Sequence, residues 1–169
     1  MDVHIETNRL LIVPFTLEDA PFIFRLLNDP LWIAGIGDRN IKTLEDAENY
    51  LRNGPLSMYS KHGFGPFKVI LKTENIPIGM CGLFKRDTLK DVDIGFAFLE
   101  AYCGMGYGKE SSLAIMDFAK NQVNVCRLVA IVSPSNLRSR SLLKSLHFRE
   151  EELIVLDGKD TILLSFVWN

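Results

Sequence analysis

Three glycines stand within five residues of the chain, in the segment CGMGYGK at positions 103–109. The segment lies between an apolar run typical of a strand and a run with helical periodicity. The first N–H groups of a helix have no intrahelical acceptor and carry positive partial charge, which favours an anion. Glycine permits positive φ and lets a phosphate group approach the main chain. We therefore predict a phosphate-binding turn here, with a tight turn that needs glycine for geometry alone as the alternative.

Two other nucleotide-binding motifs fit this segment poorly. A Walker A loop requires GxxxxGK followed by Ser or Thr, but one residue too few separates Gly104 from Gly108, and Glu110 follows the lysine. A dinucleotide fingerprint requires a third glycine further along, where Ser111 stands. The sequence therefore disfavours an ATP, GTP or nicotinamide dinucleotide site.

The spacing of apolar residues along the chain predicts the helices and strands that position this turn. Helix-like patterns begin after Thr16 and after Thr43, and each of these residues can cap a helix. Two more helices are expected near residues 106–122 and 139–146. Strand-like runs separated by turns are expected over residues 3–13, 64–71, 76–85, 92–100, 128–132, 148–156 and 161–168.

The strand, helix and strand over residues 92–132 suit a right-handed crossover between parallel strands. The sequence therefore predicts one α/β domain over residues 1–169, with a mixed, largely antiparallel sheet of about seven strands flanked by helices. A ligand crevice is expected at the carboxyl ends of the parallel pair.

Composition places the chain among ordinary globular proteins. It is 47% hydrophobic and 24% charged, with a formal net charge of -2, so no general attraction to nucleic acid or anionic lipid is built in. Its apolar runs are too short to span a bilayer, and the first residues lack the layout of a secretory signal. The cysteines and histidines show no metal-ligand spacing. We expect a cytoplasmic protein with no metal, membrane or nucleic-acid partner; a homodimer is compatible with the sequence.

Further segments extend the pattern around the glycine turn. IETNRLLI opens the chain at 5–12, VDIGF precedes the turn at 92–96, and NLRS and LLKSLHF follow it at 136–139 and 142–148. In this order they resemble segments of the GCN5-related N-acetyltransferase superfamily, above all its RimJ/RimL-like ribosomal-protein alanine acetyltransferase branch. The resemblance implies an enzyme that transfers acetyl directly from acetyl-coenzyme A to a primary amine of a protein amino terminus or a small molecule.

The resemblance also implies where coenzyme A binds. Amides of the glycine turn would hold its pyrophosphate, the strand over residues 93–99 would pair with its pantetheine arm, and Asn136 would contact it. The residues expected to bind it are Phe96, Phe98, Leu99, Cys103, Gly104, Met105, Gly106, Tyr107, Gly108, Lys109, Asn136, Ser139 and Arg140. Arg138, Arg140 and Lys144 could approach its 3′-phosphate, with a solvated basic helix face as the alternative.

Acetyl transfer to an amine needs a base, because an alkylammonium cannot attack a thioester. The glutamate of the family's AEIGY motif corresponds to Asp93, which is the first candidate base, directly or through water; Glu100 is the second. The alternative for Asp93 is a solvated charge in a polar turn, because Lys90 and Asp91 precede it. Ser139 is a candidate proton donor, with helix capping as the alternative. Backbone N–H groups near residues 96–99 could stabilise the oxyanion. The acceptor pocket is expected to involve Trp32, Ile33 and Tyr59, which could otherwise simply fill the core.

Three positions depart from the family pattern. Cys103 replaces a polar or aromatic residue, Asp93 is one methylene shorter than glutamate, and His147 replaces the glycine of a Gly-Phe pair. A tyrosine that many members carry after the asparagine is also missing. Two alternatives follow: a non-catalytic coenzyme A binding module or sensor, and a ping-pong reaction through a Cys103 thiolate activated by the helix start.

Overall fold

Eight strands form one mixed sheet in the computed structural model, which describes residues 3–168. The strands are β1 (Ile5–Glu6), β2 (Leu10–Pro14), β3 (Pro66–Leu71), β4 (Ile76–Phe84), β5 (Val92–Phe98), β6 (Arg127–Val132), β7 (Arg149–Leu156) and β8 (Lys159–Val167). Their order across the sheet is β1-β2-β3-β4-β5-β6-β8-β7. Neighbouring strands are antiparallel except β5 and β6, which are parallel. The predicted mixed, largely antiparallel sheet is therefore confirmed.

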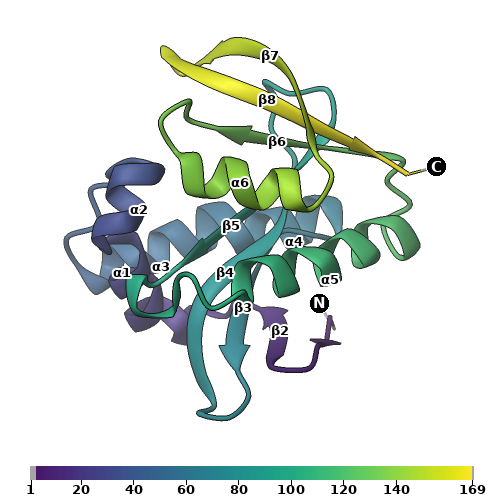
Figure 1. Cartoon of the computed structure of the whole chain (residues 1–169). Coiled ribbons are helices and arrows are strands. Elements are labelled where there is room, and N and C mark those ends of the chain that lie inside the picture. The colour runs from purple at the N-terminus through teal and green to yellow at the C-terminus, as the bar shows by residue number, and fades with distance from the viewer. Residues whose placement is uncertain (1–2, 169) are drawn as a thin grey trace.

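Helices cover both faces of this sheet. In Figure 1, α5 (Tyr107–Asn121) and α6 (Leu137–Ser145) lie in front of the sheet, while α3 (Leu44–Leu51) and α4 (Ser57–His62) lie behind it. The other helices and helical turns are η1 (Leu17–Asp19), α1 (Ala20–Leu27), α2 (Pro30–Gly35), η2 (Arg52–Leu56) and η3 (Glu100–Tyr102). Within residues 3–168, no helix combines the length and apolar character needed to cross a membrane.

Two apolar clusters join the helices to the sheet. One packs α5 and α6 against the strands and includes Phe67 and Ile115, both fully buried. The other packs α1 and α3 against the opposite face and includes Leu26 and Leu51. Because both faces are covered, the central strands are buried on both sides, which explains why their sequences are almost continuously apolar.

The prediction of one strand over residues 3–13 is wrong. The chain turns back on itself after β1, so that Ile5 pairs with Ile12 and β1 and β2 form an antiparallel hairpin. Thr7 makes the turn, because its N–H donates to the carbonyl of Leu10 and its hydroxyl oxygen accepts from the N–H of Leu10. This division is the reason that the sheet has eight strands and the prediction had about seven.

A helix that the sequence did not predict follows α1. The run Asn-Asp-Pro at 28–30 ends α1, as expected, but the same residues also begin α2. The Asp29 side chain accepts a hydrogen bond of 2.9 Å from the N–H of Leu31, and Pro30 occupies the first helical position. An acidic N-cap followed by proline is a favoured helix start.

The parallel strands β5 and β6 are joined for only two residues. Val92 pairs with Leu128 and Asp93 pairs with Val129, after which the strands diverge. Toward its carboxyl end, β5 therefore keeps an antiparallel partner, β4, on one edge only. The divergence opens the sheet where the sequence predicted a ligand crevice.

The end of α6 explains one departure from the family pattern. His147 has a φ of +67°, a left-handed conformation that favours glycine. The N–H of His147 donates to the carbonyl of Lys144, and the N–H of Phe148 donates to the carbonyl of Leu143. These two bonds form a Schellman motif, in which Phe148 and Leu143 are both buried. The position therefore requires a left-handed residue, which histidine supplies at a cost.

We expect His147→Gly to stabilise the fold by about 0.5–1 kcal/mol, because the strain of a left-handed side chain exceeds the added chain entropy of glycine. Urea unfolding would measure the change. Asn75→Gly is a matched control, since Asn75 has a φ of +54° but asparagine tolerates this conformation. A His147→Gly variant no more stable than wild type would contradict the strain argument.

Candidate active site

A cavity of about 660 Å³ opens at the carboxyl ends of β5 and β6. Its walls come from α2, the end of β5, the glycine turn before α5 and the start of α6. The predicted coenzyme-binding residues that line it are Phe96, Phe98, Cys103, Gly104, Gly106, Gly108, Lys109, Asn136 and Ser139. Residues far apart in the chain thus meet at one crevice, which lies where the strands diverge.

The glycine turn presents main-chain N–H groups that are not used within the fold. Gly104 and Gly106 have φ values of +79° and +84°, and a Cβ on Gly104 would meet no atom within 4 Å. Among residues 3–168, no hydrogen-bond acceptor is found for the amides of residues 104–109. Consecutive free amides at the start of a helix form a concave anion site. The turn therefore fits a phosphate group.

The charged side chains on the cavity wall have the sign that a phosphate needs. Lys109 and Arg138 line the cavity, and no carboxylate lines it among the described residues. Arg140 instead binds Glu150 through Nε and Nη2, at 3.0 and 2.9 Å, and donates to the carbonyl of Pro134. Lys144 also contacts Glu150, at 3.2 Å. Arg138, rather than Arg140 or Lys144, is thus the basic residue of α6 on the cavity.

Asn136 caps α6 at the edge of the cavity. Its side-chain oxygen accepts a hydrogen bond of 3.1 Å from the N–H of Ser139. Its nitrogen would lie 3.1 Å from a Cβ on Gly35, so α2 and the start of α6 approach each other closely. The Ser139 hydroxyl has no hydrogen-bond partner among the described residues. The cap therefore involves the backbone of Ser139 and leaves its hydroxyl available.

The free edge of β5 supplies further main-chain groups. The N–H of Leu99 donates to the carbonyl of Ile78 on β4, at 3.0 Å. Because antiparallel pairing alternates every two residues, the peptide groups of Phe96 and Phe98 face away from β4, toward the side from which β6 diverges. An extended ligand in the crevice can pair with this edge.

Asp93 lies at the vertex where β5 and β6 part. Its side chain is 1% exposed, and the Nε of Arg86 contacts both of its oxygens, at 3.0 and 3.2 Å. Burial raises the pKa of Asp93 to about 6, although the Arg86 guanidinium acts in the opposite direction. Asp93 does not line the cavity, which reaches Phe96, about 10 Å further along the strand.

The other predicted catalytic and acceptor residues occupy different positions. Glu100 is exposed at the start of η3, outside the cavity lining. Trp32 lines the cavity, and its buried indole N–H has no hydrogen-bond partner among residues 3–168. Ile33, on the same helix, is 41% exposed and points elsewhere. Tyr59 lines a separate cavity of about 580 Å³, where its hydroxyl accepts from the N–H of Phe15.

Besides Arg140, three of the predicted coenzyme-binding residues lie beside the cavity without lining it. Leu99 is buried in the cluster behind the sheet, and the side chain of Met105 is exposed. Tyr107 lies under the guanidinium of Arg9, 4.4 Å from its ring centroid. Their side chains are thus structural or exposed, and only their main-chain groups remain candidates for ligand contact.

The surroundings of Cys103 favour the neutral thiol over the thiolate. Burial raises its pKa, although nearby Arg138 acts in the opposite direction. Its sulfur lies 3.7 and 3.6 Å from the carbonyls of Phe98 and Leu99. The sequence argument for a thiolate relied on the helix start, but these carbonyls accept from a neutral thiol.

The sequence prediction missed several cavity residues. Tyr102 lines the cavity from η3, and Leu31 and Ala34 line it from α2. The missed signal for α2 was the Asp-Pro pair, whereas no local pattern distinguishes Tyr102 from a core tyrosine. Within residues 3–168, no group of three or more His, Cys, Asp or Glu side chains could hold a metal ion.

Comparison with known proteins decides the family. Residues 9–149 match the family described as acetyltransferase (GNAT) domain. The chain belongs to the GNAT family of acetyltransferases. This confirms the resemblance drawn from the sequence, and the GNAT enzyme is an acetyl-coenzyme A dependent N-acetyltransferase.

Individual proteins agree with this placement. An uncharacterized N-acetyltransferase of Bacillus subtilis (strain 168), YnaD, is 28% identical over 149 residues, which cover 88% of this chain and 84% of the relative. An acetyltransferase structure from Agrobacterium tumefaciens str. C58 matches 99% of this chain and 96% of its own, with a TM-score of 0.85 and 20% identity. RimL, a ribosomal L7/L12 alpha-N-protein acetyltransferase solved in complex with coenzyme A, matches 98% of each chain, with a TM-score of 0.84 and 16% identity. Both structures share the fold.

We expect kcat/KM of this GNAT enzyme to fall as the pH drops below about 6, because Asp93 as the candidate base must be ionised to accept a proton. Arg86→Gln removes the cation that lowers this pKa, so the acid limb should move to higher pH. A pH profile of kcat/KM for both proteins would measure the shift.

The matched control for this profile is Arg52→Gln, because Arg52 forms only an exposed ion pair with Glu48. Its acid limb should coincide with that of wild type. An acid limb at the wild-type pH in folded Arg86→Gln would show that a group other than Asp93 controls it.

Proposed function

We propose that this chain binds acetyl-coenzyme A by gripping its diphosphate with the main-chain amides of residues 104–109 and passes the acetyl group directly to a primary amine. The observation that carries the proposal is the glycine turn. Its amides lack acceptors within the described residues, and two of its glycines are left-handed. Of the described residues, two cations, Lys109 and Arg138, and no carboxylate line the cavity onto which the turn opens.

The rest of the crevice suits a long donor. Arg138 and Lys109 offer charge for phosphate groups, and the free edge of β5 offers main-chain partners to an amide-bearing arm. Acetyl-coenzyme A supplies a thioester, whose acyl carbon is the electrophile. The N–H of Phe96 faces the crevice by its register, which makes it our candidate donor to the developing oxyanion.

Asp93 is our candidate general base. Its carboxyl is buried, and burial raises its pKa to about 6, which brings it closer to the pH at which a general base must act. Because it stands about 10 Å along the strand from Phe96, we propose that it takes the amine proton through water. The Ser139 hydroxyl, or that of Tyr102, would return a proton to the departing sulfur, since both residues line the cavity.

Direct transfer agrees better with the geometry than an acyl-enzyme does. A ping-pong reaction would need a thiolate at Cys103, whose pKa is raised by burial. If no acyl-enzyme forms, donor and amine must occupy the crevice together, in a ternary complex.

The acceptor is proposed to be the α-amine of a protein amino terminus or a small-molecule amine. RimL, which shares the fold, is an alpha-N-protein acetyltransferase of ribosomal L7/L12, so amino-terminal peptides deserve the first trial. Trp32 on α2 is the candidate acceptor contact, because it lines the cavity and has an unused indole donor. Membership of the GNAT acetyltransferase family argues against the non-catalytic coenzyme A module that the sequence left as an alternative.

We expect Gly104→Glu to weaken acetyl-coenzyme A binding by at least about 100-fold, because it places a carboxylate among amides meant for phosphate. Isothermal titration calorimetry would measure the loss. Gly63→Glu is the matched control: Gly63 has a similar φ of +71°, and a Cβ there would also meet no atom within 4 Å. Equal affinity in the two variants would overturn the proposed site.

We expect Asp93→Asn to lower kcat by about 100-fold or more and leave the Kd of acetyl-coenzyme A unchanged, because a general base acts on the amine and not on the donor. Release of free thiol with a panel of amino-terminal peptides and small amines would measure kcat. A kcat close to that of wild type in folded Asp93→Asn would show that another group accepts the amine proton.

A further inference from the structure

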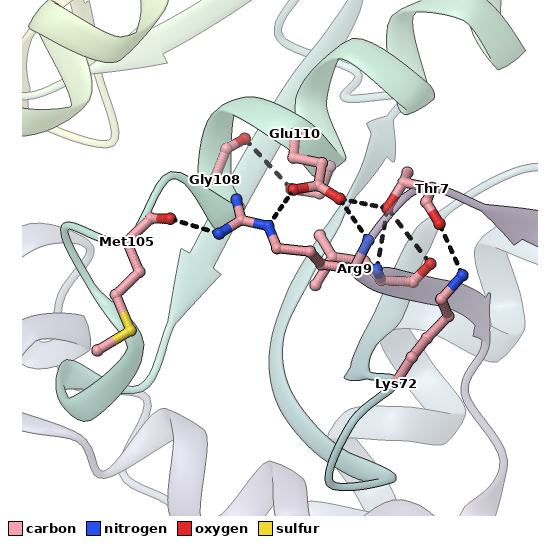
Figure 2. A network of polar contacts seen from close by, with 8 residues as sticks. Thr7, Arg9, Lys72, Met105, Gly108 and Glu110 are labelled. Atoms are coloured by element: carbon pink, nitrogen blue, oxygen red, sulfur yellow. Dashed lines mark hydrogen bonds and ion pairs between the residues drawn. The ribbon is translucent and has the colours of Figure 1, made fainter.

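The glycine turn is tied to the amino-terminal end of the chain. Figure 2 shows Glu110, in the first turn of α5, between Thr7 and Arg9. Glu110 Oε1 accepts from the Thr7 hydroxyl at 2.6 Å and from the N–H of Arg9 at 2.9 Å, and its Oε2 accepts from the Nε of Arg9 at 2.7 Å. Burial alone would raise the pKa of Glu110, but these donors outweigh it and lower the pKa, so the carboxylate stays charged.

The guanidinium of Arg9 reaches beyond this carboxylate to the turn itself. Its Nη1 donates to the carbonyl of Met105 at 2.9 Å, as Figure 2 shows. Its plane lies over the Tyr107 ring, and its Nη2 would be 3.2 Å from a Cβ on Gly106. One side chain thus contacts three consecutive residues of the turn from one side.

The contact with Met105 fixes the direction of the next amide. The carbonyl of Met105 and the N–H of Gly106 belong to one planar trans peptide, in which they point in opposite directions. Arg9 holds the carbonyl on its own side, so the N–H of Gly106 must face the other side. Gly106 lines the cavity, where that N–H would meet a phosphate.

We propose that Arg9 is a positioning residue for the donor diphosphate, acting through the Met105–Gly106 peptide and oriented by Glu110. The inference rests on the proposed function of the turn. Glycines leave the turn many conformations, and ordering them at binding would cost affinity. The clamp of Thr7, Arg9 and Glu110 orders the glycine turn beforehand, because it ties that turn to the β1–β2 turn, about 100 residues away in the chain.

The test compares two donors that differ in the diphosphate: acetyl-coenzyme A and S-acetylpantetheine, which lacks it. For Arg9→Ala and Glu110→Gln, we expect the KM of acetyl-coenzyme A to rise about tenfold with kcat unchanged. With S-acetylpantetheine, kcat/KM should equal that of wild type. Arg9→Lys should behave like Arg9→Ala, because a lysine keeps the charge but cannot bind Glu110 and Met105 together.

Arg52→Ala is the control, since its exposed ion pair with Glu48 lies on the helices behind the sheet. Calorimetric Kd values for acetyl-coenzyme A give a second measurement that needs no turnover. The Kd of Arg9→Ala should be about tenfold larger than that of wild type. Equal losses with both donors would show a general folding defect and overturn the positioning role. Normal KM and Kd values in Arg9→Ala would overturn it as well.

The proposed function fails on a different result, namely a wild-type protein that does not bind acetyl-coenzyme A or a Gly104→Glu variant that binds it normally. A different outcome would refute only the role of Arg9. In that outcome wild type binds acetyl-coenzyme A, Gly104→Glu does not, and Arg9→Ala binds it with the wild-type Kd.

Discussion

The short parallel pairing of β5 and β6 is the constraint from which the site follows. Buried main-chain groups need hydrogen-bond partners, yet β5 loses its second neighbour after Asp93. The strand edge beyond that point is left for a ligand, the cavity fills the space between the strands, and the buried carboxylate marks the vertex. If the ladder continued to Phe98, the same residues would form an ordinary sheet interior without a crevice.

The proposed anion-binding turn depends on parts of the chain that lie far apart. Its glycines provide the conformations, α5 provides the free amides, and residues of the first hairpin hold the turn in place. Asn136 brings α6 to the opposite side, where Gly35 of α2 approaches it. A turn so rich in glycine would be mobile by itself, so the surrounding elements supply the order that binding needs.

Local signals in the sequence predicted most of the fold. The glycine turn, the Thr43 cap and the turn between the last two strands are set by neighbouring residues, and the sequence placed each of them correctly. The prediction failed where distant contacts decide. Thr7 turns the chain back after β1 and donates a hydrogen bond to Glu110, about 100 residues away. Arg140 was predicted to bind the coenzyme, but it pairs with Glu150 and does not line the cavity. Aromatic type alone could not separate Tyr59, in another cavity, from Tyr102 in this one.

The pairing of Glu150 with Arg140 and Lys144 has a consequence for how an anionic donor reaches the protein. Glu150 binds both side chains outside the cavity lining and cancels one of their two charges, so Arg138 and Lys109 are the cations that an approaching molecule meets at the cavity wall. The chain as a whole is acidic, with a formal net charge of -2. Long-range attraction is therefore weak, and capture depends on a small positive region that acts within about one Debye length, roughly 8–10 Å at ordinary ionic strength.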